Sequence, residues 1–373
     1  KRAPGTNKSR PIRNFTVLCT MEEFVEPGQR PPHARKARQL KEARDLPPNS
    51  SRMSLSEIDP ALARARDLVL KSLPEGPALW LRPPGDTPCP DPESRFEQPW
   101  YPEFHRLLSL GWKPLAEESR EWDRVVVFGS RQKEETRRLL DRARRVARDL
   151  VYLAVPNEYG GKSWKSELEG VQGEEVGRKS RLFVLSPLET ELAVEDFGEN
   201  SAGFTSTPGL FSWDKIDRGS ELLAGVLSEQ SLRGPVVDLG AGWGYLPTRL
   251  SPHLEFHLVE ADRRGLVAAE ANLKGRNVHL HWADASDPQS LPPGLKGRVP
   301  AVITNPPFHT HKKADPVLGG AFVATAGWLL KKGGACYLVG NSHLPYAKIM
   351  EAVFSNVEVL LQQDGFKVYR GLK

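Results

Sequence analysis

With 373 residues, of which 39% are hydrophobic and 27% charged, the chain has the composition of a globular protein and the length of two domains. Its apolar runs are far shorter than the roughly 20 residues that a membrane helix needs, and its three cysteines are too widely spaced for a metal pair or a disulfide framework. We therefore expect a cytoplasmic protein with no membrane partner. The net charge of +5 is the sum of +7 in residues 1–52 and −2 in the remainder.

Residues 1–52 are rich in Pro, Arg, Lys and Ser and show no sustained periodicity. Too little apolar surface is present to bury, so we expect a disordered tail. Two other interpretations stay open. The segment is a basic arm that contacts nucleic acid, or it is an upstream extension, because Met53 followed by Ser54 resembles a natural start with a helix cap.

The segment 53–195 alternates predicted strands and helices, which favours an α/β domain with parallel strands. None of its predicted strands ends in an acidic residue followed by a glycine-rich turn, so we expect no nucleotide site there. The predicted elements are a helix at 54–73, a strand at 122–128, a charged helix at 134–150, a strand at 150–155, a helix at 163–171 and a strand at 181–185.

The segment 196–373 opens with a long loop, 196–220, that contains Phe204, Phe211 and Trp213. Such a loop is either a linker or a lid over a site. Regular alternation follows: helix 220–230, strand 235–239, helix 243–251, strand 255–259, helix 263–273, strand 278–282, strand 300–304, helix 315–331, strand 335–339, helix 345–354 and a hairpin of 356–362 with 365–371.

The strand at 235–239 runs into Asp238-Leu-Gly-Ala-Gly-Trp-Gly244, with three glycines within five positions. Glycines let a backbone turn tightly and approach a ligand closely. By itself this turn is compatible with a nicotinamide, a flavin, another nucleotide or S-adenosylmethionine, and also with a purely structural turn. The spacing G-x-G-x-G differs from the dinucleotide pattern G-x-G-x-x-G.

The next three strands also end in polar residues, where ligands of open α/β sheets bind. Glu260 ends the second strand, in position to accept both hydroxyls of a ribose, and Asp284 ends the third, in position to bind an adenine amino group. Glu260 is alternatively a helix cap or a surface charge, and Asp284 is the weaker candidate because Asp287 is nearby in a loop-like stretch. All four strand ends together favour S-adenosylmethionine.

The fourth strand ends in Asn305-Pro-Pro-Phe308. Two prolines fix the backbone and remove two donors, so carbonyl oxygens point into the site. The side-chain oxygen of Asn305 and the carbonyl of Pro306 can accept hydrogen bonds from an exocyclic –NH2, and Phe308 offers a face for base stacking. These acceptors would direct the nitrogen lone pair of a base towards a methyl group.

Together, Val236–Gly244, Glu260, Asp284 and Asn305–Phe308 resemble class I S-adenosylmethionine-dependent methyltransferases that act on amino groups. Three segments narrow the resemblance to the ribosomal RNA small subunit methyltransferase C family and its large-subunit relatives, which methylate guanine N2 in ribosomal RNA: Thr207–Leu223, Asn305–His309 and Phe366–Arg370. The chain departs from the family at Thr310–Lys313, where Asp-Gly is usual.

The resemblance implies an α/β fold of two tandem Rossmann-like methyltransferase domains, a degenerate one at 53–195 and a catalytic one at 196–373. It implies a role in cofactor binding for Asp238, Gly240, Gly242, Gly244, Glu260, Asp284 and Asn305. It implies that Asn305, Pro306 and Phe308 hold the target guanine. In the same family, Phe211, Asp217 and Gly219 border the cofactor, whereas Lys312, Lys313, Lys367 and Arg370 are either phosphate contacts or solvated charges.

We therefore expect a transferase, with RNA-binding and rRNA-processing roles, that methylates guanine N2 in ribosomal RNA, with 16S RNA favoured. The expected cofactor is S-adenosylmethionine, without a metal, and the expected partner is ribosomal RNA or a ribosomal subunit. A monomer is expected. His309 is either the proton acceptor or a turn residue. The alternatives are another amino acceptor, either adenine N6 or a protein glutamine, and a non-catalytic RNA-binding assembly factor.

Overall fold

The computed structural model describes residues 58–116, 122–188, 196–307, 309–310, 313–314 and 316–373. The tail at 1–52, the first residues of the helix expected at 54–73, Phe308 and Lys312 lie outside this part, as do the side chains of His309 and Lys313. All described residues belong to one compact unit. Among them, no helix is both long and apolar enough to cross a membrane.

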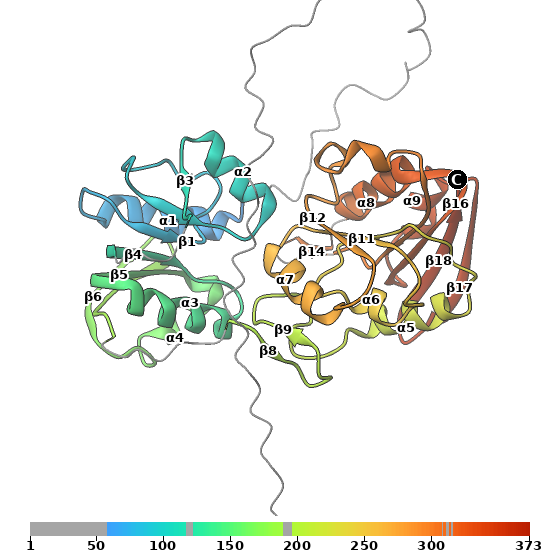
Figure 1. Ribbon diagram of the computed structural model, residues 1–373. Coiled ribbons are helices and arrows are strands. Elements are labelled where there is room, and N and C mark those ends of the chain that lie inside the picture. The colour runs from blue at the N-terminus through green and yellow to red at the C-terminus, as the bar shows by residue number, and fades with distance from the viewer. Residues whose placement is uncertain (1–57, 117–121, 189–195, 308, 311–312, 315) are drawn as a thin grey trace, which may run out of the picture. The chain divides into compact units, whose positions relative to one another are not determined.

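The first sheet has the strand order β3-β2-β1-β4-β5-β7-β6 (Figure 1). Its first five strands are parallel, and β7 and β6 are antiparallel additions. The elements are α1 Pro60–Ser72, β1 Leu79–Leu81, β2 Arg95–Glu97, α2 Tyr101–Ser109, β3 Lys113–Pro114, β4 Trp122–Phe128, α3 Lys133–Val146, β5 Ala147–Pro156, α4 Gly161–Trp164, β6 Val171–Gly177 and β7 Ser180–Leu185, with a 3-10 turn at Asn157–Tyr159.

Part of this half differs from the sequence prediction. The helix predicted at 163–171 is wrong, because α4 ends at Trp164 and β6 begins at Val171. β6 pairs with β7 through a turn at Arg178 and Lys179, both of which have positive φ, as two-residue hairpin turns require. The helix predicted at 134–150 ends earlier, at Val146, since the next residue already belongs to β5.

The second sheet repeats the same topology, with the order β12-β11-β10-β13-β16-β18-β17. In each sheet the strand that comes first along the chain, β1 or β10, lies third in the order. An antiparallel hairpin, β6 with β7 or β17 with β18, forms the last two strands. The elements are α5 Arg218–Ser228, β10 Val236–Leu239, α6 Tyr245–Thr248, β11 Phe256–Glu260, α7 Arg263–Asn272, β12 Val278–Trp282, β13 Val299–Thr304, α8 Pro316–Leu329, β16 Leu330–Asn341, α9 Tyr346–Glu351, β17 Asn356–Gln363 and β18 Phe366–Leu372.

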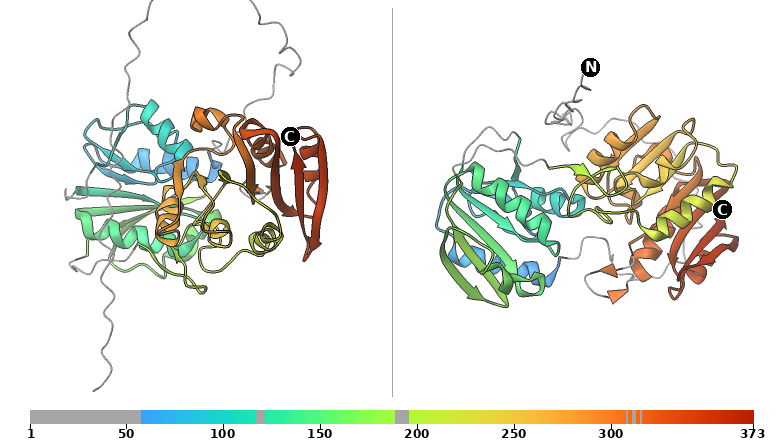
Figure 2. Two further views of the ribbon diagram at one scale, coloured as in Figure 1. Left: turned by 45° about the vertical axis from the view of Figure 1, so that its right-hand side comes forward. Right: turned by 90° about the horizontal axis from the view of Figure 1, so that it is seen from below.

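The long loop before α5 carries the short pair β8 Gly198–Glu199 and β9 Thr205–Ser206, and β14 His309–Thr310 pairs with β15 Lys313–Ala314 after the fourth strand. Helices cover both faces of each sheet (Figures 1 and 2). In the second sheet one core contains residues of α5 and α7, and the other contains residues of α8 and α9. The expected fold of two Rossmann-like domains is confirmed.

Candidate active site at the strand ends of the second sheet

The glycine turn after β10 is a left-handed turn that only glycine adopts without strain. Gly240, Gly242 and Gly244 have φ values of +74°, +54° and +82°. A Cβ on Gly244 would lie 3.0 Å from the Cβ of Ala269 in α7, so this glycine allows the helix to pack closely. A Cβ on Gly242 would meet no atom within 4 Å, which leaves its side open to the cavity that it lines.

Glu260, at the end of β11, is bonded to this turn. One carboxylate oxygen accepts from the backbone N–H of Gly242 at 2.8 Å, and the other accepts from the N–H of Asp262 at 2.8 Å. Desolvation raises the pKa of Glu260 to about 7, although these backbone N–H groups favour the charged form. Each oxygen keeps a further lone pair, so the carboxylate is still able to accept from a diol.

Asp238 lies beneath the turn and is almost fully buried, with 1% of its surface exposed. Neither carboxylate oxygen has a hydrogen-bond partner within the described part of the chain. Desolvation, and then the charge of Glu260, hold the pKa of Asp238 well above its ordinary value. An unpaired buried carboxylate is costly, and a cationic ligand group in the adjacent cavity would relieve that cost.

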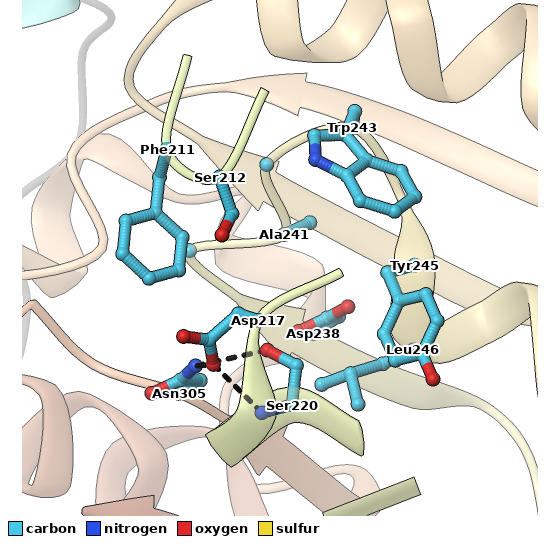
Figure 3. Close-up of a pocket in the computed structure, with 12 residues that line it drawn as sticks. Phe211, Ser212, Asp217, Ser220, Asp238, Ala241, Trp243, Tyr245, Leu246 and Asn305 are labelled. Atoms are coloured by element: carbon cyan, nitrogen blue, oxygen red, sulfur yellow. Dashed lines mark hydrogen bonds between the residues drawn. The ribbon is translucent and has the colours of Figure 1, made fainter. Parts of the chain in front are cut away.

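Asn305, which follows β13, has a defined orientation. Its Nδ2 donates to a carboxylate oxygen of Asp217 and to the hydroxyl oxygen of Ser220, each at 2.9 Å (Figure 3). The same Asp217 oxygen accepts from the backbone N–H of Ser220 at 2.8 Å and so caps α5. With both amide protons bonded to these residues, the oxygen of Asn305 is the side-chain acceptor that remains for a ligand.

Two cavities meet at this point. The smaller, about 40 Å³, is lined by Asp217, Ser220, Asp238 and Asn305 among others, and Figure 3 shows these side chains around it. The larger, about 650 Å³, lies beside Glu260, Asn305, Pro306 and Pro307. The half-exposed ring of Phe211, together with Gly240, Gly242 and Asn305, lines both cavities.

The larger cavity is also lined by side chains of the first half, which the sequence did not indicate as part of a site. They include Arg82, Gln98, Glu103, Arg131, Glu135 and Tyr159. Desolvation raises the pKa of Glu103 to about 7. The start of α2 also contacts the residue that follows β11, because the N–H of Tyr101 donates to the carbonyl of Ala261 at 2.8 Å.

The other expected residues take different positions. Asp284 is buried and lines neither cavity, and one of its oxygens accepts from the N–H and the hydroxyl of Ser286 at 2.8 and 2.5 Å. The neighbouring Ala285 lines the larger cavity instead. Gly219 is in neither cavity; a Cβ there would lie 3.1 Å from both Asp217 and Phe366. Arg370 pairs with Glu358.

Residues 201–370 match the family described as methyltransferase small domain. Ribosomal RNA small subunit methyltransferase C of Yersinia pseudotuberculosis serotype IB is 34% identical over 179 residues, 47% of this chain and 50% of that protein. The Yersinia enterocolitica protein of that name is 36% identical over 166 residues, 44% of this chain and 46% of that protein. The chain thus spans about half the length of these relatives.

Among solved structures, the T. thermophilus 16S rRNA N2 G1207 methyltransferase in complex with AdoMet and guanosine has a TM-score of 0.70 at 23% identity. The match covers 86% of this chain and 94% of that one, so the likeness of fold extends over both halves. Residues 201–370 match the methyltransferase small domain family, and the resemblance of the chain to ribosomal RNA small subunit methyltransferase C is confirmed.

Proposed function

We propose that this chain is an S-adenosylmethionine-dependent methyltransferase that transfers a methyl group to the exocyclic N2 amine of a guanine in ribosomal RNA, with 16S RNA as the favoured substrate. One observation carries the proposal. The Asn305 amide, bonded through both protons to Asp217 and Ser220, leaves its oxygen as an acceptor in a cavity shared with the glycine turn. The names of the relatives and of the similar structure support the same activity.

The residues present fit the cofactor. Asp238 is an unpaired buried carboxylate beside the smaller cavity and would pair with the cationic amino group of the methionine part. Glu260 would accept from the ribose hydroxyls. Asp284 is buried and lines neither cavity, so the structure adds no support for its expected contact with the adenine. When bound, S-adenosylmethionine supplies an electrophilic methyl group on sulfur.

The acceptor amine would lie against Asn305 and Pro306. Its two hydrogens would donate to the side-chain oxygen of Asn305 and to the carbonyl oxygen of Pro306, while Phe308 stacks on the base. Because the lone pair of an exocyclic amine is delocalised into the ring, these acceptors favour the pyramidal nitrogen that attacks the methyl carbon. The enzyme supplies mainly orientation and proximity. The target base must be unpaired or flipped out of its stack.

The first half would serve RNA positioning rather than cofactor binding. Its β1 is the topological equivalent of β10, but it continues into Arg82-Pro83-Pro84 instead of a glycine turn. Glu97 ends β2 as Glu260 ends β11, yet both of its oxygens accept from the guanidinium of Arg142, at 2.8 and 2.6 Å. Because Arg142 is bonded to both oxygens, the Glu97 carboxylate is not available to a ribose. We place the domain boundary near residue 195.

The test is methylation of 30S subunits, 50S subunits and naked ribosomal RNA with labelled cofactor, followed by mapping of the labelled base. Label on guanine N2, absent with Asn305→Ala, is the expected result. Label on adenine N6 or on a protein would replace the substrate assignment with one of the alternatives. Calorimetry that detects no binding of S-adenosylmethionine would instead indicate a non-catalytic RNA-binding factor.

A further inference from the structure

Three histidines and a glutamate gather on one face of the second sheet, away from the glycine turn. His257 in β11 pairs in register with His279 in β12, and His281 lies two residues further along β12. Glu255 directly precedes β11. Side chains two residues apart on a strand share a face, so all four project from the same side of the sheet. The methyltransfer chemistry proposed above uses none of them.

The three candidate donor atoms of Glu255, His257 and His279 all lie within 4.8 Å of one another. One Glu255 oxygen lies 3.4 Å from Nε2 of His257 and 3.3 Å from Nε2 of His279. Both distances exceed the usual 2.7–3.2 Å of an N–H···O hydrogen bond. A tetrahedral zinc site with ligand bonds of about 2.0–2.1 Å has edges of about 3.3–3.4 Å, which these distances match.

The second nitrogen of His257 also has the contact that a metal-bound histidine requires. Its Nδ1 lies 2.9 Å from Nε2 of His281. When Nδ1 donates its proton across this contact, Nε2 carries the free lone pair and faces Glu255. The ring of His257 stacks on both neighbours, with centroids 4.6 Å from His279 and 5.1 Å from His281, which orders the donors in advance.

We propose that Glu255, His257 and His279 form a binding site for a divalent transition metal, with zinc as the favoured ion. The donor atoms are one Glu255 oxygen and the Nε2 atoms of the two histidines, and a fourth position is left for water because His279 is exposed. Two imidazoles and one carboxylate suit zinc, nickel or cobalt, whereas magnesium and calcium prefer oxygen ligands alone. The site fastens the edge strand β12 to β11.

The experiment uses the full chain, freed of metal with a chelator and then titrated with Zn²⁺ by calorimetry. We expect one equivalent to bind and to raise the Tm. His279→Asn removes an exposed ligand with little risk to the fold and is expected to weaken binding at least about 100-fold. His253→Asn, an exposed histidine outside the cluster, is the matched control and is expected to bind as the parent does.

A second arm measures Co²⁺ absorption, because tetrahedral cobalt gives strong visible bands. Replacing the outer histidine by His281→Phe is expected to weaken metal binding about 10–100-fold while the cobalt bands persist at saturation. The proposal is overturned if no zinc binds, if His279→Asn binds as tightly as the parent, or if cobalt gives only the weak bands of six-coordinate ions. These readouts do not involve methyltransfer and do not depend on the proposed function.

Discussion

Three carboxylates near the glycine turn have pKa values raised by desolvation: Asp238, Glu260 and Asp284. Desolvation disfavours the charged form of an acid. Perturbed carboxylates in a cleft are typical of functional sites, and Asp238 and Glu260 each line one of the two cavities, whereas Asp284 lines neither. In the protein without cofactor they oppose folding at neutral pH.

The pH dependence follows from the sign of the Glu260 shift. Its pKa is about 7 in the folded chain against an ordinary 4.5, so between these values the folded state holds the proton that the unfolded state has lost. Stability contributed by this group therefore falls as the pH rises from 4.5 to about 7. Urea denaturation at pH 5 and pH 7.5 measures this, and Glu260→Gln is expected to reduce the difference.

Cofactor binding should have the opposite pH dependence. A ribose diol donates to the charged form of Glu260, so affinity for S-adenosylhomocysteine is expected to rise between pH 6 and pH 8, with uptake of the ligand releasing a proton. Calorimetry in buffers of different ionisation enthalpy measures the proton. Glu103→Gln is the control, because Glu103 also has a pKa of about 7 in the larger cavity. If the pH dependence of binding disappeared in Glu103→Gln, the assignment of this titration to Glu260 would be contradicted.

Substituting Gly242 tests whether a ligand approaches the backbone there, and a second glycine at positive φ controls for backbone strain. Gly242→Ala and Gly275→Ala both place a Cβ at positive φ, +54° and +84°, with no atom within 4 Å. Both variants are expected to lose about 1–2 kcal/mol of folding free energy. Only Gly242→Ala should weaken cofactor binding, by at least about 10-fold, because its Cβ enters the cavity. Equal affinities measured by calorimetry would exclude a close approach at Gly242.

Ser220 orients Asn305, which predicts a kinetic effect. Ser220→Ala removes one acceptor of the Asn305 amide. One hydrogen bond contributes about 0.5–1.5 kcal/mol, so kcat for RNA methylation is expected to fall roughly 3–10-fold, with the KM for the cofactor little changed. Ser228→Ala lies in the same helix, bonds only to the Gly225 carbonyl, and serves as control. A drop of the same size in both variants would refute an orienting role.

At the scale of elements, one strand order occurs twice, but only the second copy carries the glycine turn after its first strand. β10 is followed by glycines at positive φ, whereas its equivalent β1 is followed by Arg82 and two prolines. Prolines withhold N–H groups and restrict the backbone, so the first copy cannot form the same turn.

This asymmetry predicts the stoichiometry of binding. Calorimetric titration of the full chain with S-adenosylmethionine is expected to give one site per chain rather than two. Asp238→Ala should weaken that site, because it removes the buried carboxylate that would pair with the cationic amino group of the cofactor. The fold of this variant is checked by circular dichroism and its Tm. A second site that survives Asp238→Ala would assign cofactor binding to the first half as well.

At the scale of the whole molecule, a buried glutamate joins the two halves. Glu135 in α3 contacts Arg264 in α7 at 2.6 Å and also pairs with Arg82, and only 5% of its side chain is exposed. Arg264 in turn contacts Asp262 at 2.6 Å, two residues after Glu260. The network therefore connects helix α3 of the first half with the part of the second half that contains Glu260 and the glycine turn.

Removing this glutamate leaves two guanidinium groups without their shared partner. Glu135→Ala is expected to lower the free energy of unfolding by about 3–5 kcal/mol, as loss of one member of a buried ion pair does. Glu134→Ala removes a half-exposed partner of Arg137 and is expected to cost about 1 kcal/mol or less. Urea denaturation compares the two variants. Equal destabilisation would show that the network contributes no more than a surface pair.

The sequence alone predicted the resemblance to a methyltransferase family and the strand ends at Gly240, Glu260 and Asn305. The first half was less predictable: β1 and β2 have three residues each, and the sequence predicted no strand at either position. Strands this short have almost no period to detect, and pairing with β4 stabilises them. The helix predicted at 163–171 failed because the chain turns through 165–170 and joins the hairpin with β7 only at Val171.

By itself, therefore, the sequence determined the α/β class, the glycine turn and the acceptor motif, because period, glycine spacing and proline act within a few residues. Tertiary structure alone decided that Ser220 and Asp217 orient Asn305, that Arg82 and Glu103 line the larger cavity, and that Glu255 meets His257 and His279. Most of these contacts join residues far apart in the chain. Only the packing of the elements brings such side chains together, and no local pattern records it.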